Sequence, residues 1–322
     1  MDTFLEEINL GGLSYTYEGP EKKLEIILFT SQPGLRDNND RRWERVVKAS
    51  RSDIISQTST KYLDAYLLSE SSLFVWDDRI LMITCGKTTL IETLPEIIKI
   101  VDQEKVALVF YERKNFMFPQ EQPADFEEDV VLIEKHFPGK SYRLGPANHD
   151  HIHVFYSSHA KTQIEQDATL QVLMHGIDPS VIDIFCPQDT KNRDQIGKHS
   201  GLNRIYPHME TDSHLFSPDG YSLNGIFADK YYTVHVTPHS DWSYASFETN
   251  VLETDYSEII KQVVSIFKPE KFSLLLTTSM DEKYLDGYST LANVISEYNV
   301  TEKSLYEFDC GYSIMFLNCS YA

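Results

Sequence analysis

The sequence predicts an α+β protein, a four-layer α/β/β/α sandwich of two antiparallel sheets that come from two similar halves of the chain. Two observations lead to this expectation. The order strand, strand, helix, strand occurs between residues 72 and 111 and again between residues 231 and 277. The helical stretch of each unit is apolar along one side, so it would cover one face of its sheet. The two uncovered faces would then bury each other.

The first unit begins with short strands at residues 72–75 and 80–84, around a turn at Asp77-Asp78. Residues 90–101 then have the periodicity of a helix, and residues 106–111 are typical of a strand. The apolar residues of the helical stretch share one face: Leu90, Ile91, Leu94, Ile97, Ile98 and Val101.

The second unit repeats this order. Strands are expected at residues 231–237 and 243–247, around a turn at residues 238–241, and residues 272–277 form another run rich in strand-forming residues. Between them, residues 255–267 have helical periodicity. The apolar face of that helix consists of Ile259, Ile260, Val263, Val264 and Phe267.

The composition is that of a soluble protein with an acidic surface. The 322 residues carry a net charge of −20, which argues against nucleic acid or an anionic membrane as a partner. No apolar run approaches the roughly 20 residues of a membrane-spanning helix, and the first residues lack the zones of a signal peptide. We therefore expect a cytoplasmic protein whose four cysteines are free thiols.

Two local patterns imitate sites of other protein classes. Residues 86–89 (GKTT) match the end of a nucleotide-binding P-loop, but the motif's first glycine is replaced by Leu81. His149, His151 and His153 alternate and would share one face of a strand, yet no cysteine or acidic motif completes a metal site. We expect neither nucleotide hydrolysis nor a bound metal.

One segment carries a specific chemical signature. Residues 66–75 (YLLSESSLFV) place the sequence Leu-Ser-Glu-Ser-Ser before a strand, and this resembles the self-cleavage site of the eukaryotic S-adenosylmethionine decarboxylases. Other segments match that family in the same order along the chain. They are residues 17–25, 84–86, 110–116, 220–225, 235–238 and 246–250. The resemblance covers nearly the whole chain and implies a single domain over residues 1–322.

The resemblance implies that the chain cuts itself between Glu70 and Ser71, into residues 1–70 and 71–322. A serine hydroxyl needs a nearby base and a strained carbonyl to attack a peptide bond. Attack on the Glu70 carbonyl would give an ester, and its elimination and hydrolysis would leave a pyruvoyl cofactor derived from Ser71. Ser222 and His235 match the family residues that handle protons during this processing, with His235 taking the α-proton.

The resemblance also implies how the mature site works. The substrate amine forms a Schiff base with the pyruvoyl group, which acts as an electron sink for loss of carbon dioxide. Cys85 matches the family's proton donor to carbon, although a lone cysteine on a strand is more often a small buried apolar residue. Glu18 and Glu21 match acidic residues of the active site. Their spacing of three would place them on opposite faces of one strand, so we expect a bend or bulge there.

Five residues match substrate contacts of the family: Tyr17, Leu68, Glu70, Phe216 and His239. Tyr17 and Phe216 correspond to the aromatic pair that sandwiches the adenine ring. His239 departs from the family, in which a glutamate typically binds the ribose hydroxyls. A neutral imidazole offers one acceptor where a carboxylate offers two oxygens, so weaker substrate binding is expected.

Animal members of the family are activated by putrescine, bound among carboxylates between the sheets. Glu25, Asp167, Thr169, Gln171 and Glu248 match that site. Gln171 replaces a glutamate and Ile83 replaces a lysine, so the response to putrescine is in question. The resemblance also implies a homodimer.

The function that follows is decarboxylation of S-adenosylmethionine, the step that supplies aminopropyl groups for spermidine and other polyamines. The alternative is an inactive relative that serves as a regulatory or structural subunit. His239, Gln171 and Ile83 favour that alternative. The intact cleavage pair, Cys85, Ser222 and His235 favour an enzyme.

Overall fold

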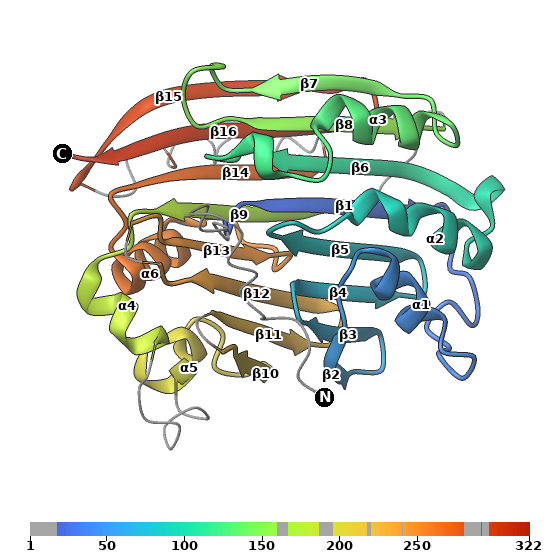
Figure 1. Cartoon of the computed structure of the whole chain (residues 1–322), viewed down its shortest axis with the longest axis horizontal. Coiled ribbons are helices and arrows are strands. Elements are labelled where there is room, and N and C mark those ends of the chain that lie inside the picture. Colours follow the sequence, from blue (N-terminus) through green and yellow to red (C-terminus); the bar gives the residue numbers. More distant parts are fainter. Residues whose placement is uncertain are drawn as a thin grey trace, which may run out of the picture.

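The computed structural model describes residues 18–159, 167–186, 196–217, 220–239, 241–279, 291 and 296–322. Their strands form two eight-stranded antiparallel sheets, with helices on the outer faces (Figure 1). The strand orders are β2-β3-β4-β5-β1-β6-β8-β7 and β10-β11-β12-β13-β9-β14-β16-β15. This confirms the predicted pair of antiparallel sheets.

The first half of the chain supplies one sheet. Its strands are β1 (Glu21–Leu28), β2 (Ile54–Ser59), β3 (Leu63–Leu68), β4 (Ser71–Trp76), β5 (Arg79–Cys85), β6 (Val106–Lys114), β7 (Lys140–Leu144) and β8 (Ile152–Ser158). Its helices are α1 (Arg42–Ala49), α2 (Leu94–Ile100) and α3 (Phe126–Glu134), with short 3₁₀ turns at Leu90–Thr93, Gln103–Lys105 and Pro119–Glu121.

The second half supplies the other sheet. Its strands are β9 (Ala168–His175), β10 (Glu210–Leu215), β11 (Tyr221–Phe227), β12 (Lys230–Thr237), β13 (Tyr244–Thr249), β14 (Lys271–Ser279), β15 (Tyr298–Glu307) and β16 (Tyr312–Tyr321). Its helices are α4 (Pro179–Phe185), α5 (Ile196–His199) and α6 (Ser257–Phe267), with a 3₁₀ turn at Leu202–Arg204.

The two strand orders correspond position by position, so the fold is a duplicated unit. The hairpin β4–β5, helix α2 and strand β6 correspond to β12–β13, α6 and β14, which are the two predicted units. One detail differs from expectation. Residues 90–101 were predicted as one helix, but a 3₁₀ turn ends at Thr93 and α2 starts at Leu94. Pro95 explains the break, because proline fits the first turn of a helix and has no N–H for the turn before it.

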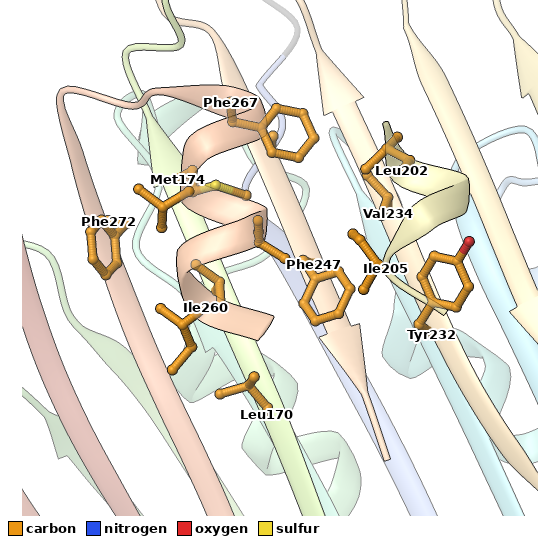
Figure 2. Packing of buried hydrophobic residues seen from close by; sticks show 14 of the residues in the cluster. Leu170, Met174, Leu202, Ile205, Tyr232, Val234, Phe247, Ile260, Phe267 and Phe272 are labelled. Carbon is orange, nitrogen blue, oxygen red and sulfur yellow. The ribbon is translucent and has the colours of Figure 1, made fainter. Parts of the chain in front are cut away.

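The outer layers are apolar. In the second half, Ile260 and Phe267 of α6 lie over Met174 of β9, Phe247 of β13 and Phe272 of β14 (Figure 2). Burying each such side chain contributes about 1.5–3 kcal/mol to folding. The equivalent cluster of the first half joins α1, α2 and α3 to β1, β3, β4, β5, β6 and β8.

The layer between the sheets is mixed. Apolar clusters drawn from both sheets hold it together, one around Phe110 and Phe316 and one around Phe74 and Tyr231. Charged residues lie on the same faces. Because Leu24 and Ile26 of β1 pack on the helix side, the alternate residues of that strand point toward the second sheet. Those residues are Glu21, Lys23, Glu25 and Ile27.

Candidate active site

Ser71 is the first residue of β4 and has an unusual backbone conformation. It follows the turn at Ser69-Glu70 and pairs with Leu68 at the end of β3. Its φ of 99° lies in the left-handed region, which costs a residue other than glycine about 1–3 kcal/mol. The residue is only 2% exposed. The predicted cleavage point therefore lies in a strained and buried hairpin.

Cys85, the last residue of β5, lies directly beside this turn. The Ser71 hydroxyl donates a hydrogen bond to Cys85 Sγ at 3.2 Å. The same sulfur lies 3.8 Å from Glu70 Oε2. Two strands and one turn thus bring together the three residues that the sequence assigned to cleavage and proton donation.

His235 of β12 faces the first sheet and is held at both ring nitrogens. Its Nδ1 is 2.6 Å from Glu21 Oε1 on β1, and Ser246 on β13 donates to the same oxygen at 2.7 Å. Its Nε2 is 2.9 Å from Ser72 Oγ. A carboxylate on Nδ1 fixes the tautomer in which Nε2 can act as a base. Glu21 is therefore placed to orient His235.

His235 Nε2 has two hydroxyl neighbours, Thr233 at 3.1 Å and Ser72 at 2.9 Å. Ser72 is the residue after the predicted nucleophile, and the sequence did not single it out. Ser72 Oγ also lies 2.7 Å from Asn224 Oδ1, and Asn224 Nδ2 donates to the Tyr66 carbonyl at 3.2 Å. The signal was available, because Ser72 alternates with Phe74 on β4 and so faces the second sheet. Ser222 pairs with His235 across β11 and β12 and is buried in the same layer.

Glu18 does not share a strand with Glu21. It lies before β1, and the register of β1 with β5 runs without interruption from Glu21, so no bulge is needed within this pairing to separate the two carboxylates. The Glu18 carboxylate accepts hydrogen bonds from the backbone of Met117 at 2.6 Å and Phe118 at 2.9 Å. Burial raises the pKa of Glu18, and these two amides act against that rise. Glu18 thus holds the loop that carries Phe118.

The predicted substrate contacts differ in how accessible the structure leaves them to a ligand. Tyr17 lies outside the described residues. The Leu68 side chain is fully buried on the helix side of the first sheet, so only its backbone remains for a ligand. Phe216 lies in the connection before β11, where its N–H donates to the Gly220 carbonyl at 2.8 Å. His239 is exposed and stacks on Trp242, with ring centroids 3.5 Å apart.

The carboxylates predicted to bind putrescine already have cationic partners. Arg79 lies 3.2 Å from Glu25 and 2.7 Å from Asp167, and Tyr312 donates to Asp167 at 2.8 Å. Burial acts to lower the pKa of Arg79, but the two carboxylates raise it well above its ordinary value. The sequence interpretation did not assign Arg79 to any site.

Lys23 supplies the positive charge for Glu248, another carboxylate between the sheets. Its ammonium is 3.0 Å from Glu248, which also accepts a hydrogen bond from Tyr231. Burial raises the pKa of Glu248 to about 7, although Lys23 lowers it. Burial acts to lower the pKa of Lys23, but the surrounding carboxylates raise it above its ordinary value.

The two remaining residues of the predicted putrescine site lie on β9. The Gln171 amide donates to Glu112 Oε2 at 2.7 Å, and Thr169 is buried two positions before it. A cavity of about 10 Å³ beside Lys23, Glu112 and Gln171 has room for about one water molecule.

The two patterns that imitate a P-loop and a metal site form other contacts in the structure. Gly86 and Thr88 offer backbone carbonyls to the Lys22 ammonium. His151 Nδ1 lies 2.7 Å from the His149 carbonyl. Within the described residues, no group of three or more potential ligands could hold a metal ion, and no helix is long and apolar enough to cross a membrane.

Comparisons with known proteins agree on one family. A family model described as adenosylmethionine decarboxylase matches residues 14–320. The S-adenosylmethionine decarboxylase proenzyme of Dictyostelium discoideum is 32% identical, over 98% of this chain and 88% of its own length. The Drosophila melanogaster proenzyme is 36% identical, over 89% and 88%. A crystal structure of the Trypanosoma brucei AdoMetDC-delta26 monomer matches with a TM-score of 0.64 and 26% identity, over 78% of this chain and 99% of that one. The chain therefore belongs to the adenosylmethionine decarboxylase family.

Proposed function

We propose that this chain is a self-processing proenzyme that decarboxylates S-adenosylmethionine, with a pyruvoyl cofactor formed from Ser71. The observation that carries the proposal is the strained, buried Ser71, whose hydroxyl lies 3.2 Å from the Cys85 sulfur. The relatives are named as proenzymes of this activity. An intact-mass spectrum and a carbon dioxide release assay test the two parts of the proposal separately.

Processing starts from the hairpin of β3 and β4. The Ser71 oxygen forms a bond to the Glu70 carbonyl carbon, the carbon–nitrogen bond breaks, and the hydroxyl proton ends on the Ser71 nitrogen. The left-handed φ of Ser71 favours this step, because breaking the peptide bond releases the strain. Elimination then removes the α-proton of Ser71 and frees the Glu70 carboxylate. Hydrolysis of the remaining imine releases ammonia and leaves residues 1–70 and 71–322.

His235 is our candidate base for the elimination. Glu21 on Nδ1 fixes the tautomer in which Nε2 carries no proton, and the contact of Nε2 with Ser72 holds the ring one residue along the chain from Ser71. Ser222 lies beside it in the same buried layer. We assign both to processing.

The residues around Ser71 also fit a pyruvoyl group at this position. Such a group supplies the electron sink for loss of carbon dioxide. Cys85 is near enough to donate its proton to carbon afterward, with Glu70 beside the sulfur. Phe216, Tyr17 and the Leu68 backbone are our candidates for adenine binding, and His239 for ribose.

Cys85→Ala is expected to bind substrate but to turn over at least tenfold more slowly, because no thiol remains to protonate carbon. It should also inactivate faster, since protonation at the wrong atom transfers the amine to the cofactor. Carbon dioxide release over time measures both effects. Cys319→Ala, a buried cysteine on β16, is the matched control and should keep its turnover. Unchanged turnover in Cys85→Ala would leave the residue as strand packing.

His239→Glu is expected to tighten S-adenosylmethionine binding by about 1.5–3 kcal/mol, because a carboxylate can accept hydrogen bonds from both ribose hydroxyls. The gain should appear mainly as a lower KM, since the ribose lies away from the breaking bond. Calorimetry measures the affinity, and His136→Glu, another exposed histidine, controls for added charge. An unchanged affinity would show that another group, such as Asp241, already binds the ribose.

We further propose that putrescine has little effect on this chain. Arg79 and Lys23 already neutralise Glu25, Asp167 and Glu248, so a bound dication would gain little. Gln171 removes one more carboxylate from the site.

The product serves spermidine and polyamine synthesis, and the homodimer implied by the resemblance stays a prediction that sedimentation measurements can check. The alternative, an inactive regulatory subunit, rests on His239, Gln171 and Ile83. It is not favoured, because the Ser71 hydroxyl lies against the Cys85 sulfur and Glu21 orients His235.

A further inference from the structure

We propose that Asn224 is a positioning residue for His235: its side-chain oxygen accepts the hydroxyl protons that would otherwise occupy Nε2, so that Nε2 can take the α-proton of Ser71. The inference rests on the proposed role of His235 in processing. The proposed chemistry does not otherwise use Asn224, which lies in one of the segments that match the family, residues 220–225.

Asn224 connects the two sheets beside the hairpin that carries the cleavage turn. It lies on β11 opposite Thr233 of β12 and is 2% exposed. Its Nδ2 donates to the carbonyl of Tyr66 on β3 at 3.2 Å. This bond sets the direction of the amide, because the reverse orientation would place two carbonyl oxygens against each other. Oδ1 therefore points to the hydroxyl groups around His235.

Two hydroxyls share two acceptors in this buried group. Ser72 Oγ lies 2.7 Å from Asn224 Oδ1 and 2.9 Å from His235 Nε2. Thr233 Oγ1 lies 2.9 Å from the same Oδ1 and 3.1 Å from the same Nε2. Each hydroxyl has one proton, an amide oxygen can accept two, and an unprotonated ring nitrogen can accept one. Both hydroxyls can therefore donate to Asn224 at once, or one of them can donate to His235.

Ser72 depends on Asn224 more than Thr233 does. Thr233 Oγ1 can also donate to the Leu223 carbonyl at 3.1 Å. Ser72 Oγ lies 3.3 Å from Thr233 Oγ1, which is longer than an ordinary hydrogen bond between hydroxyls. Without Asn224, the Ser72 hydroxyl would keep its proton directed at Nε2, because a buried donor without an acceptor is costly. That hydrogen bond occupies the lone pair that has to take the α-proton.

The elimination step shows why this matters. The Ser72 hydroxyl first turns from Nε2 to Asn224 Oδ1. The α-carbon–hydrogen bond of Ser71 then breaks and Nε2 takes the proton. The electron pair of that bond forms a carbon–carbon double bond, while the bond from the β-carbon to the ester oxygen breaks and frees the Glu70 carboxylate. The new Nε2–H can donate to Ser72 Oγ, whose own proton stays on Asn224. Every buried polar group of the set thus keeps a partner throughout the step.

The test separates ester formation from elimination. Wild type and variants are made by cell-free translation, sampled over time and treated with hydroxylamine, which cleaves an ester much faster than a peptide bond. A cleaved ester gives a large fragment that begins with serine, whereas completed elimination gives one that begins with pyruvoyl, and mass spectrometry distinguishes the two. Asn224→Leu, which has a similar shape but no acceptor, should eliminate about tenfold more slowly and accumulate ester.

The accumulated species distinguishes this role from a purely structural one. A loosened hairpin would lose the strain at Ser71 and leave an uncleaved amide instead of an ester. Asn224→Asp keeps an acceptor oxygen and should not accumulate ester.

Asn318→Leu is the matched control. Asn318 Nδ2 donates to the Asp150 carbonyl at 2.7 Å, and its Oδ1 accepts from the Ser273 hydroxyl at 2.7 Å. It therefore makes the same two kinds of contact, but it lies on β16, with three strands between β16 and β12. This variant should process like the wild type.

A share of ester in Asn224→Leu equal to that of the wild type would overturn the inference and leave the proposed function standing. An uncleaved amide in place of the ester, or an equal share of ester in Asn224→Asp and Asn224→Leu, would also overturn it. Should Asn224→Leu fail to fold, Asn224→Ala removes the same oxygen and is judged by the same measurement. A wild type that never cleaves would overturn both the inference and the proposed function.

Discussion

Ser71→Ala is expected to abolish self-cleavage completely, because no hydroxyl remains to form the ester with the Glu70 carbonyl. The wild type should give two fragments, residues 1–70 and 71–322, with the larger one capped by a pyruvoyl group in place of an amine. The variant should remain one chain of 37.2 kDa and release no carbon dioxide from S-adenosylmethionine. Intact-mass spectrometry measures cleavage and cap together.

Ser69→Ala is the matched control for this experiment. Ser69 lies in the same turn, but its hydroxyl accepts a hydrogen bond from the Asp53 N–H at 3.0 Å and is not the proposed nucleophile. It should cleave like the wild type. The same two fragments from Ser71→Ala would refute the assigned nucleophile. A wild-type chain that stays intact for days at neutral pH would instead support an inactive relative.

Lys23→Met is expected to lower the free energy of unfolding by about 3–5 kcal/mol, because it leaves buried carboxylates without their cation. The Lys23 ammonium interacts electrostatically with Glu248, Glu112 and Glu25, and each of them raises its pKa. Urea unfolding in the Ser71→Ala background gives the value for a single uncleaved chain. A loss below about 1 kcal/mol would mean that these carboxylates do not depend on Lys23.

Glu248→Gln should lower the free energy of unfolding less than Lys23→Met does, so the two variants can be compared directly. The pKa of Glu248 is raised to about 7, so its stabilising contribution is present below the ordinary glutamate range and is lost as pH rises through about 7. A glutamine at this position does not titrate, so the variant does not lose stability in this way as the pH rises. The stability of Glu248→Gln relative to its parent should therefore improve between pH 5 and pH 8, whereas Lys23→Met should remain destabilised.

Putrescine links this comparison to the proposed function. Removing Lys23 opens space and leaves negative charge between the sheets, so added putrescine should restore part of the stability of Lys23→Met. The parent should respond little, because Lys23 and Arg79 already occupy the carboxylates. Equal stabilisation of both proteins would contradict a site filled by the chain's own cations.

The sequence by itself determined the architecture and supplied the pair that we propose to react. Periods of two and of 3.6 residues are local properties, so both units and the outer apolar layers could be predicted without a structure. The proposed cleavage site, Glu70 and Ser71, was found through the resemblance to the family, whose motif lies within one short segment of the chain. Cys85 ends β5, the strand that pairs with β4, only 14 residues from Ser71.

Only the tertiary structure decided which side chains meet between the sheets. His235 contacts Ser72 and Glu21 across sequence separations of 163 and 214 residues, and Arg79 meets Asp167 across 88. These contacts depend on strand register and on how one sheet lies over the other. Neither is encoded in a local pattern, because a shift of one residue turns every side chain of a strand to its opposite face. The contacts of Ser72 and Arg79 therefore emerged only from the folded chain.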